Sequence, residues 1–94
     1  DVAELAEGLT LGMPYPNPFS DKTALNFTLP TSSRVTMSVY NSLGEKVAVI
    51  FDGVTFDAGT HTVTVQGSTL PTGMYYLNFN VGGVTAMRRL LIVR

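Results

Sequence analysis

The chain has 94 residues, a length typical of a single domain. Its composition, 45% hydrophobic and 14% charged, excludes an intrinsically disordered chain, and a net charge of −1 gives no bulk electrostatic reason to bind nucleic acid or an acidic membrane. The absence of cysteine excludes disulfides and cysteine-based zinc sites, and no apolar run reaches the roughly 18 residues of a membrane span.

The first eight residues show a weak helical period at Val2, Leu5 and Ala6. A segment of this length cannot hold a helix by itself, because nucleating a helix is costly. We therefore interpret residues 1–8 as a linker and residues 9–94 as the folded domain.

Residues 14–20 read Pro-Tyr-Pro-Asn-Pro-Phe-Ser and are called the proline segment below. Each proline fixes φ, removes an N–H donor and favours extended geometry in the residue before it. We expect a stiff extended segment, Tyr15-Pro16-Asn17-Pro18-Phe19, along an edge of the domain. The hypothesis is that the Tyr15 and Phe19 rings anchor it on the core, while the prolines keep that edge from pairing with other strands.

Apolar and polar residues alternate with period two along most of the remaining chain, which is typical of strands. Lys46–Phe51 is instead almost continuously apolar, which favours a strand buried on both sides or at a sheet junction. Asp52-Gly53 and Asp57-Ala-Gly59 predict turns, and Gly82-Gly83 predicts a tight hairpin. The expected fold is an all-β, immunoglobulin-like antiparallel sandwich of about seven strands without helices. The strand ranges expected here are Thr23–Leu29, Arg34–Tyr40, Lys46–Phe51, Thr60–Val65, Met74–Val81 and Val84–Val93.

Residues that could carry chemistry are few and scattered. His61 lies in an alternating strand without an acidic or serine partner at a useful spacing, so we expect a half-buried structural histidine. A calcium site at Asp52 and Asp57 is conceivable, but lone aspartates in loops are usually solvated. Asn26-Phe-Thr28 fits the N-glycosylation pattern, and its strand context makes chance the better explanation. The sequence therefore predicts no enzyme, no cofactor and no metal site.

The end of the chain, Met87–Arg94, holds three of the six basic residues. Alternation places Arg88 and Arg89 on opposite faces of the closing strand, and Arg94 is the last residue of the sequence. One interpretation is that charge on an edge strand blocks edge-to-edge aggregation. The other is that a partner recognises a short basic strand together with the terminal carboxylate. The residues alone favour the first interpretation.

Five short motifs follow one another along the chain. They are Tyr15-Pro-Asn-Pro-Phe19, a strand–turn–strand block from Val35 to Val47 with the spacing Y-x-x-x-G-x-x-V, Ala58-Gly-Thr-His61, Leu70-Pro-Thr-Gly-Met-Tyr-Tyr76, and the basic–aliphatic–basic ending Arg89–Arg94. In this order the motifs resemble those of the type A C-terminal sorting domain of the type IX secretion system, over about residues 9–94. Two departures are Val65-Gln-Gly67, where the family often has a Trp-Asp-Gly-like segment, and Arg94, where lysine is common.

This resemblance implies a β-sandwich that directs an attached cargo protein through the type IX outer-membrane translocon. The implied partners are the translocon and shuttle proteins, the upstream cargo in the same chain, and a sortase-like peptidase that usually removes the domain. Residues 1–8 would lead from that cargo. The implied location is the periplasm in transit and then the outer-membrane surface or the medium. The residues that the resemblance implies for partner recognition are Gly73, Tyr75, Arg88, Arg89 and Arg94.

An alternative belongs to another class of protein. Similar sandwich domains occur in the flagellar hook-cap family and as accessory modules of extracellular glycosidases, so the chain could be a spacer or a carbohydrate-binding module. A binding module needs an aromatic platform, and the sequence has no tryptophan. With Tyr15 and Tyr75 expected to be committed elsewhere, Tyr40 and Tyr76 are left for that platform. A plain spacer, a third possibility, would tolerate loss of the last residues.

Overall fold

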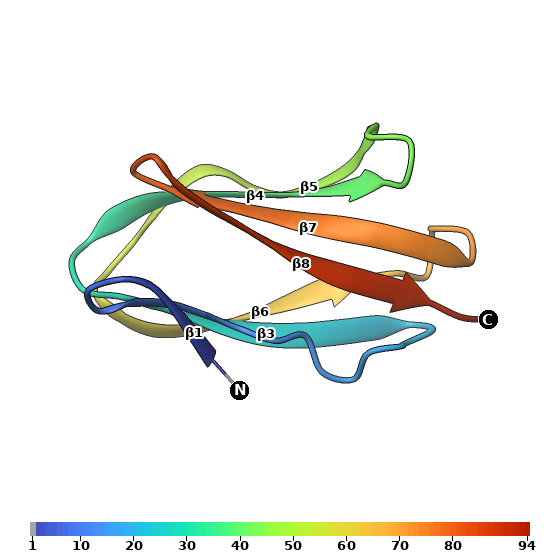
Figure 1. Ribbon diagram of the computed structural model, residues 1–94, viewed down its shortest axis with the longest axis horizontal. Helices are drawn as coiled ribbons and strands as arrows, with labels where there is room; N and C mark the ends of the chain where they lie inside the picture. Colours follow the sequence, from blue (N-terminus) through green and yellow to red (C-terminus); the bar gives the residue numbers. More distant parts are fainter. Residues whose placement is uncertain (1) are drawn as a thin grey trace.

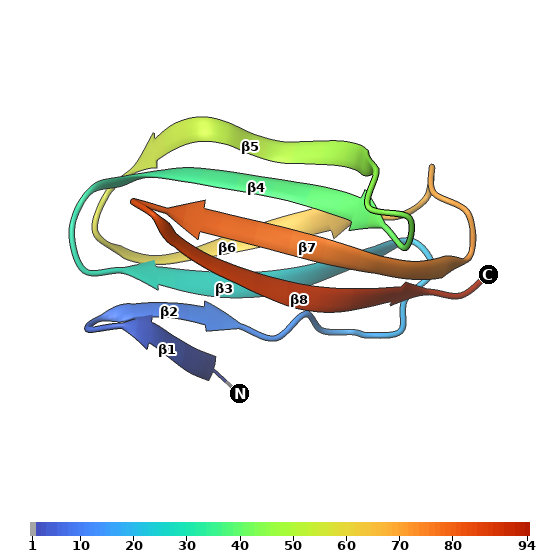
Figure 2. The same ribbon diagram turned by 45° about the horizontal axis from the view of Figure 1, so that its top comes forward.

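The computed structural model describes the backbone of residues 2–94 and the side chains from residue 5 onward. Two antiparallel four-stranded sheets pack face to face as a sandwich (Figures 1 and 2). The strand order is β1-β2-β3-β6 in the first sheet and β5-β4-β7-β8 in the second. The strands are β1 (Val2–Ala6), β2 (Leu9–Gly12), β3 (Lys22–Leu29), β4 (Ser33–Asn41), β5 (Lys46–Phe56), β6 (Gly59–Gln66), β7 (Gly73–Val81) and β8 (Val84–Ile92). The all-β sandwich expected from the sequence is confirmed.

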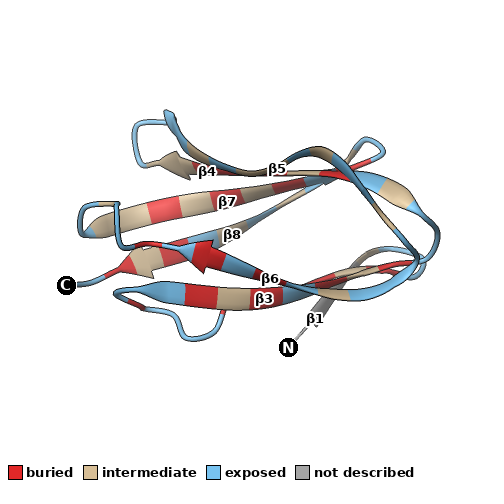
Figure 3. Cartoon of the chain, turned by 180° about the vertical axis from the view of Figure 1, so that it is seen from behind, coloured by how far each residue is buried: buried red, intermediate tan, exposed pale blue. Residues whose placement is uncertain are grey.

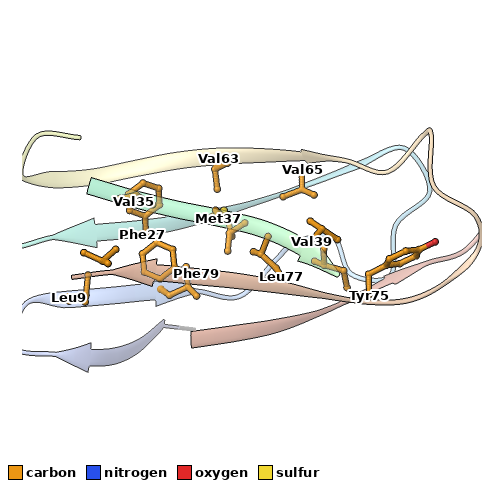
Figure 4. Packing of buried hydrophobic residues seen from close by; sticks show 14 of the residues in the cluster. Leu9, Phe27, Val35, Met37, Val39, Val63, Val65, Tyr75, Leu77 and Phe79 are labelled. Carbon is orange, nitrogen blue, oxygen red and sulfur yellow. The ribbon is translucent and has the colours of Figure 1, made fainter. Parts of the chain in front are cut away.

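The hydrophobic core fills the space between the two sheets (Figure 4). Alternation places every second side chain of a strand inside, and Figure 3 shows the resulting bands of buried and exposed residues. Fully burying a large apolar side chain contributes about 1.5–3 kcal/mol each, so these inner faces are the main source of stability. The buried apolar residues are Leu9, Leu11, Phe19, Leu25, Phe27, Leu29, Val35, Met37, Val39, Val63, Val65, Tyr75, Leu77, Phe79, Val81, Leu90 and Ile92.

His61 belongs to the packing at one end of this core. Its ring lies 5.3 Å from that of Phe27 and 5.0 Å from that of Phe56, centroid to centroid. The Nε2 atom is 2.8 Å from the carbonyl oxygen of Asp57. The expected half-buried structural histidine is therefore confirmed.

The beginning of the chain differs from the sequence prediction. Within the expected linker at residues 1–8, residues 2–6 form β1, which pairs with β2 through a hairpin at Glu7 and Gly8; Asp1 lies outside the described residues. This hairpin is one reason for eight strands rather than about seven. Backbone pairing to the free edge of β2 needs no strong side-chain pattern, so periodicity did not reveal it.

Strand β5 corrects two further expectations. Asp52 and Gly53 do not end the strand: they lie in a β-bulge within it, where Gly53 has a φ of 64° and its N–H donates to Thr36 Oγ1 at 3.2 Å. The strand is also an edge of its sheet rather than a doubly buried element, with Val49 55% exposed. A continuous apolar run cannot by itself distinguish a central strand from an edge strand.

Two kinds of feature are absent from the described residues. No helix in this part of the chain is long and apolar enough to cross a membrane. Likewise, no group of three or more histidine, cysteine, aspartate or glutamate side chains gathers there in a way that could hold a metal ion.

Candidate functional site

The proline segment connects the two sheets across the open side of the sandwich. Strand β2 pairs with β3 only at Thr28 and Phe27, so the first half of β3 is open on that side. There Tyr15 exchanges backbone hydrogen bonds with Ala24 (2.9 and 3.2 Å). Four residues later the segment reaches β8, where the Phe19 N–H donates to Leu91 O (3.0 Å). Figure 2 shows the chain leaving β2 and passing the end of β8 before it turns into β3.

Asn17 occupies the outer edge of β8 with its side chain. Its Nδ2 donates to the carbonyl of Arg89 at 2.9 Å, and its Oδ1 accepts from the N–H of Leu91, also at 2.9 Å. The N–H of Val93 then donates to Phe19 O at 2.9 Å. Backbone groups at residues 89, 91 and 93 are therefore already paired, and the proline segment replaces a fifth strand at the end of this sheet.

The two rings expected to anchor this segment lie in different environments. Phe19 is only 5% exposed and belongs to the core. A Cβ built on Gly67 would lie 2.6 Å from its ring, so the absence of a side chain at position 67 leaves the space that Phe19 fills. Tyr15 is 82% exposed, and the expectation that its ring packs on the core is not met. At Tyr15 the backbone, through the bridge to β3, holds the segment.

Arg88 points inward from β8 and joins the two sheets. Its guanidinium donates from Nη2 to Leu11 O at 2.7 Å and from Nε to Gly12 O at 3.2 Å, both at the end of β2. Hydrogen bonds from a charged donor are about twice as strong as neutral ones. Arg88 therefore satisfies two strand-end carbonyls and closes the open side of the sandwich next to the proline segment.

Arg94 fastens the end of the chain to the loop between β6 and β7. Nε donates to Leu70 O at 3.1 Å, and Nη2 lies in hydrogen-bond contact with the carbonyls of both Gly67 and Leu70. The Arg94 N–H donates to Thr72 Oγ1 at 3.3 Å. A planar guanidinium with several donors suits this cluster of carbonyls better than an ammonium group would.

Gly73 and Tyr75 support the same loop from β7. Tyr75 is buried, and its hydroxyl donates to Pro71 O at 2.7 Å (its ring is labelled in Figure 4). Gly73 pairs with Ile92 in the neighbouring strand. A Cβ there would come no closer than 3.8 Å to a neighbouring side chain, so the position is not crowded. Both residues contribute to the shape of this end, and the Tyr75 ring itself is largely inaccessible to a partner.

Arg89 differs from the other two arginines of the ending. It lies opposite Tyr76 on the outer face of β8, is exposed, and its guanidinium forms no hydrogen bond or ion pair with any side chain or backbone group in the described part of the chain. A hollow opens beside the same end, and Val93, which lines it, is 48% exposed. The hollow is lined by Pro16, Pro18, Phe19, Ser20, Asp21, Lys22 and Val93. This rigid, partly apolar surface therefore includes the exposed cation Lys22, and Arg89 lies close by, because its carbonyl oxygen is bonded to Asn17 of the same segment.

The structure places four of the five sequence-predicted recognition residues on the adjoining strands β7 and β8 and Arg94 directly after β8, with Arg88 near the middle of its strand, opposite Leu77. It adds Asn17, Gly67 and Thr72, which the sequence did not single out as contacts. The sequence does carry one indication of the Asn17 contact. Asn17 stands between two prolines, which have no backbone N–H to donate, so its side chain is the group in this stretch that can pair with an edge strand.

A family model described as a secretion system C-terminal sorting domain matches residues 14–93. The match begins at the proline segment and ends one residue before Arg94. The chain belongs to this family. The comparison with curated proteins gives no match, and neither does the comparison with solved structures.

As a type IX C-terminal sorting domain, the chain targets cargo for secretion. Membership of the family implies interaction with the secretion machinery and export across the outer membrane. The family is a targeting signal and not a catalytic domain. In this sorting domain, the proline segment, the end of β2 and the loop at residues 67–72 hold residues 88–94 in place.

Proposed function

We propose that the secretion machinery recognises the folded end of the sandwich, with Arg89 as the residue that makes direct contact. The observation that carries the proposal is the unequal use of the three arginines: Arg88 and Arg94 bond backbone carbonyls, whereas the Arg89 guanidinium is exposed. On this proposal the other four predicted residues do not touch the partner. They hold β8 and the adjoining loop in place and so position Arg89; these residues are Gly73, Tyr75, Arg88 and Arg94.

The partners proposed for this surface are the outer-membrane translocon and its shuttle proteins. An acidic site on such a partner would pair with Arg89, while the outward side of the proline segment would give shape to the contact. Because residues 89–93 along the edge of β8 are already bonded to Asn17 and Phe19, recognition by adding a strand to this part of the edge would first have to displace the proline segment.

We further propose that a sortase-like peptidase separates cargo from domain upstream of the sandwich, and that the domain passes through the periplasm before the cargo reaches the cell surface or the medium. A peptidase needs an extended, unpaired substrate, and residues 2–6 are paired with β2. Cleavage is therefore expected before β1, unless β1 detaches.

A reporter fused ahead of residues 1–94, expressed in a bacterium with a working type IX system, tests the recognition proposal. We expect Arg89→Ala to leave the reporter in the periplasm. The matched control is Arg34→Ala, because Arg34 is also an exposed arginine of the same sheet but pairs with Thr55, near the opposite end. Control and unchanged domain should both reach the surface.

A truncation lacking Leu90–Arg94 is a weaker test by itself, since it removes the buried Leu90 and Ile92 and can unfold the domain. Each variant should therefore be checked for resistance to protease. Export of a folded Arg89→Ala fusion at the level of the control would refute the proposal, and the basic ending would then be edge protection, as in a spacer domain.

A further inference from the structure

The outer face of the second sheet carries a row of four side chains that the sorting function does not use as a group. Tyr40 of β4 lies opposite Lys46 of β5 on one side and opposite Tyr76 of β7 on the other, and Tyr76 lies opposite Arg89 of β8. Directly opposed residues of a sheet point to the same face. The row therefore runs cation, ring, ring, cation across all four strands, and Lys46 Nζ lies 5.9 Å from the centre of the Tyr40 ring.

A polar hollow adjoins this row on the same face. Its walls carry hydroxyl and amide groups, and Asn80 Nδ2 donates to Thr85 Oγ1 at 2.9 Å within it. The Oδ1 atom of Asn78 is buried and has no hydrogen-bond partner. Buried polar atoms are nearly always satisfied, so this amide calls for an explanation. The hollow is lined by Thr36, Ser38, Tyr40, Lys46, Asn78, Asn80 and Thr85.

The charged side chains of the row and of the hollow's lining are cations. Lys46 is the charged residue among those that line the hollow, and Arg89 stands at the far end of the row. The nearest acid in sequence, Glu45, is engaged in the adjoining turn, where its Oε1 accepts from Asn41 Nδ2 at 2.8 Å. A ligand at this face would thus meet two cations, two aromatic rings and a floor of neutral donors and acceptors.

We propose that this face binds a saccharide that carries an anionic group, such as a carboxylate or a phosphate. The Tyr40 and Tyr76 rings would receive the apolar face of a sugar ring, since tyrosine combines an apolar body with a polar tip. The amides and hydroxyls of the hollow would pair with sugar hydroxyls, and a small shift of the side chains over Asn78 would let its Oδ1 accept one of them. Lys46 and Arg89 would pair with the anionic group.

The composition of the hollow favours this ligand over an acidic peptide. A peptide partner would be expected to bury apolar side chains in the contact, and the hollow is lined by hydroxyl and amide groups. The proposal goes beyond targeting, because the domain would bind glycans at the cell surface or in the medium whichever residues the translocon recognises. It is tested with the purified 94-residue chain, so its outcome does not depend on secretion.

The experiment is titration of the chain with oligogalacturonate, followed by amide chemical shifts. We expect shifts centred on Tyr40, Lys46 and Asn78, and an affinity about tenfold weaker, or ~1.4 kcal/mol, in Tyr40→Ala and in Lys46→Met. The control is Thr62→Ala on the outer face of the first sheet, which should bind as the unchanged chain does. If Tyr40→Ala loses its folded spectrum, Lys46→Met decides, because Lys46 is exposed.

Two comparison ligands define what would overturn the proposal. Dextran, a neutral glucose polymer, should bind much more weakly, and polyglutamate should not reproduce the shifts at Asn78. Absence of shifts with oligogalacturonate refutes the site. Equal shifts with polyglutamate would show attraction by charge alone, and equal binding by both row variants and the control would place the ligand elsewhere. Either result also overturns the proposal.

Discussion

The clearest prediction concerns the two aromatic residues of the proline segment, because the structure places them in opposite environments. Phe19 is 5% exposed and Tyr15 is 82% exposed, although they are four residues apart. Truncating a buried phenylalanine to alanine removes its transfer free energy and leaves a cavity, a cost of about 3–5 kcal/mol. Truncating a side chain as exposed as Tyr15 should change the free energy of unfolding by no more than about 0.5 kcal/mol.

For a domain of this size each kcal/mol shifts the melting temperature by about 4–8 °C. Phe19→Ala should therefore lower it by at least about 12 °C, and Tyr15→Ala by no more than a few degrees. Small domains have only about 5–15 kcal/mol of stability, so Phe19→Ala could leave little folded protein. Phe19→Leu, which keeps most of the volume and should cost about 1 kcal/mol, supplies a measurable intermediate.

The assay is thermal and urea unfolding of the 94-residue chain, followed by circular dichroism. The expected order of stability is unchanged chain, then Tyr15→Ala close to it, Phe19→Leu, and Phe19→Ala last. Equal melting temperatures for the two alanine variants would refute the reasoning, since they would mean that the ring of Phe19 contributes no more than a solvated one.

Three other perturbations test the contacts around the same end. Gly67→Ala places a Cβ 2.6 Å from the Phe19 ring and should lower the free energy of unfolding by about 1–3 kcal/mol. Its control, Gly73→Ala, meets nothing closer than 3.8 Å and should melt near the unchanged chain. The reverse order of melting temperatures would contradict this packing. Asn17→Ala removes two hydrogen bonds to β8 and should lower the free energy of unfolding by about 1–2 kcal/mol. It should also speed hydrogen exchange of the Leu91 amide, and unaltered exchange there would count against the edge pairing. Arg88→Met should lower the midpoint of urea unfolding by more than Arg89→Met does, because only Arg88 bonds the carbonyls of β2, and equal midpoints would argue against that contact.

Much of the fold could be predicted from local pattern. Strands β3, β4, β6, β7 and β8 were expected within one or two residues of their observed bounds, because each has one buried and one outward face, and this imposes period two. Strand β5 shows the limit of such patterns. Its apolar run was expected to be buried and to stop at Asp52, yet it continues through a bulge to Phe56 at the edge of the sheet. Which strand becomes an edge depends on the sheet order, and periodicity carries no information about that order.

The candidate site divides in the same way. The sequence determined that a rigid proline segment lies near one end of the chain and an arginine-rich strand at the other, and their motifs were enough to suggest a sorting domain. The tertiary structure decided that these two ends meet, with Asn17 bonded to β8 and Arg88 bonded to β2. It also decided that Phe19 is buried while Tyr15 is exposed. Of the three arginines of the ending, Arg89 is the one whose guanidinium has no hydrogen bond within the described residues. The reason is that residues more than 70 positions apart come together only through sheet order and strand register, which arise from packing of the whole core and not from any local stretch of sequence.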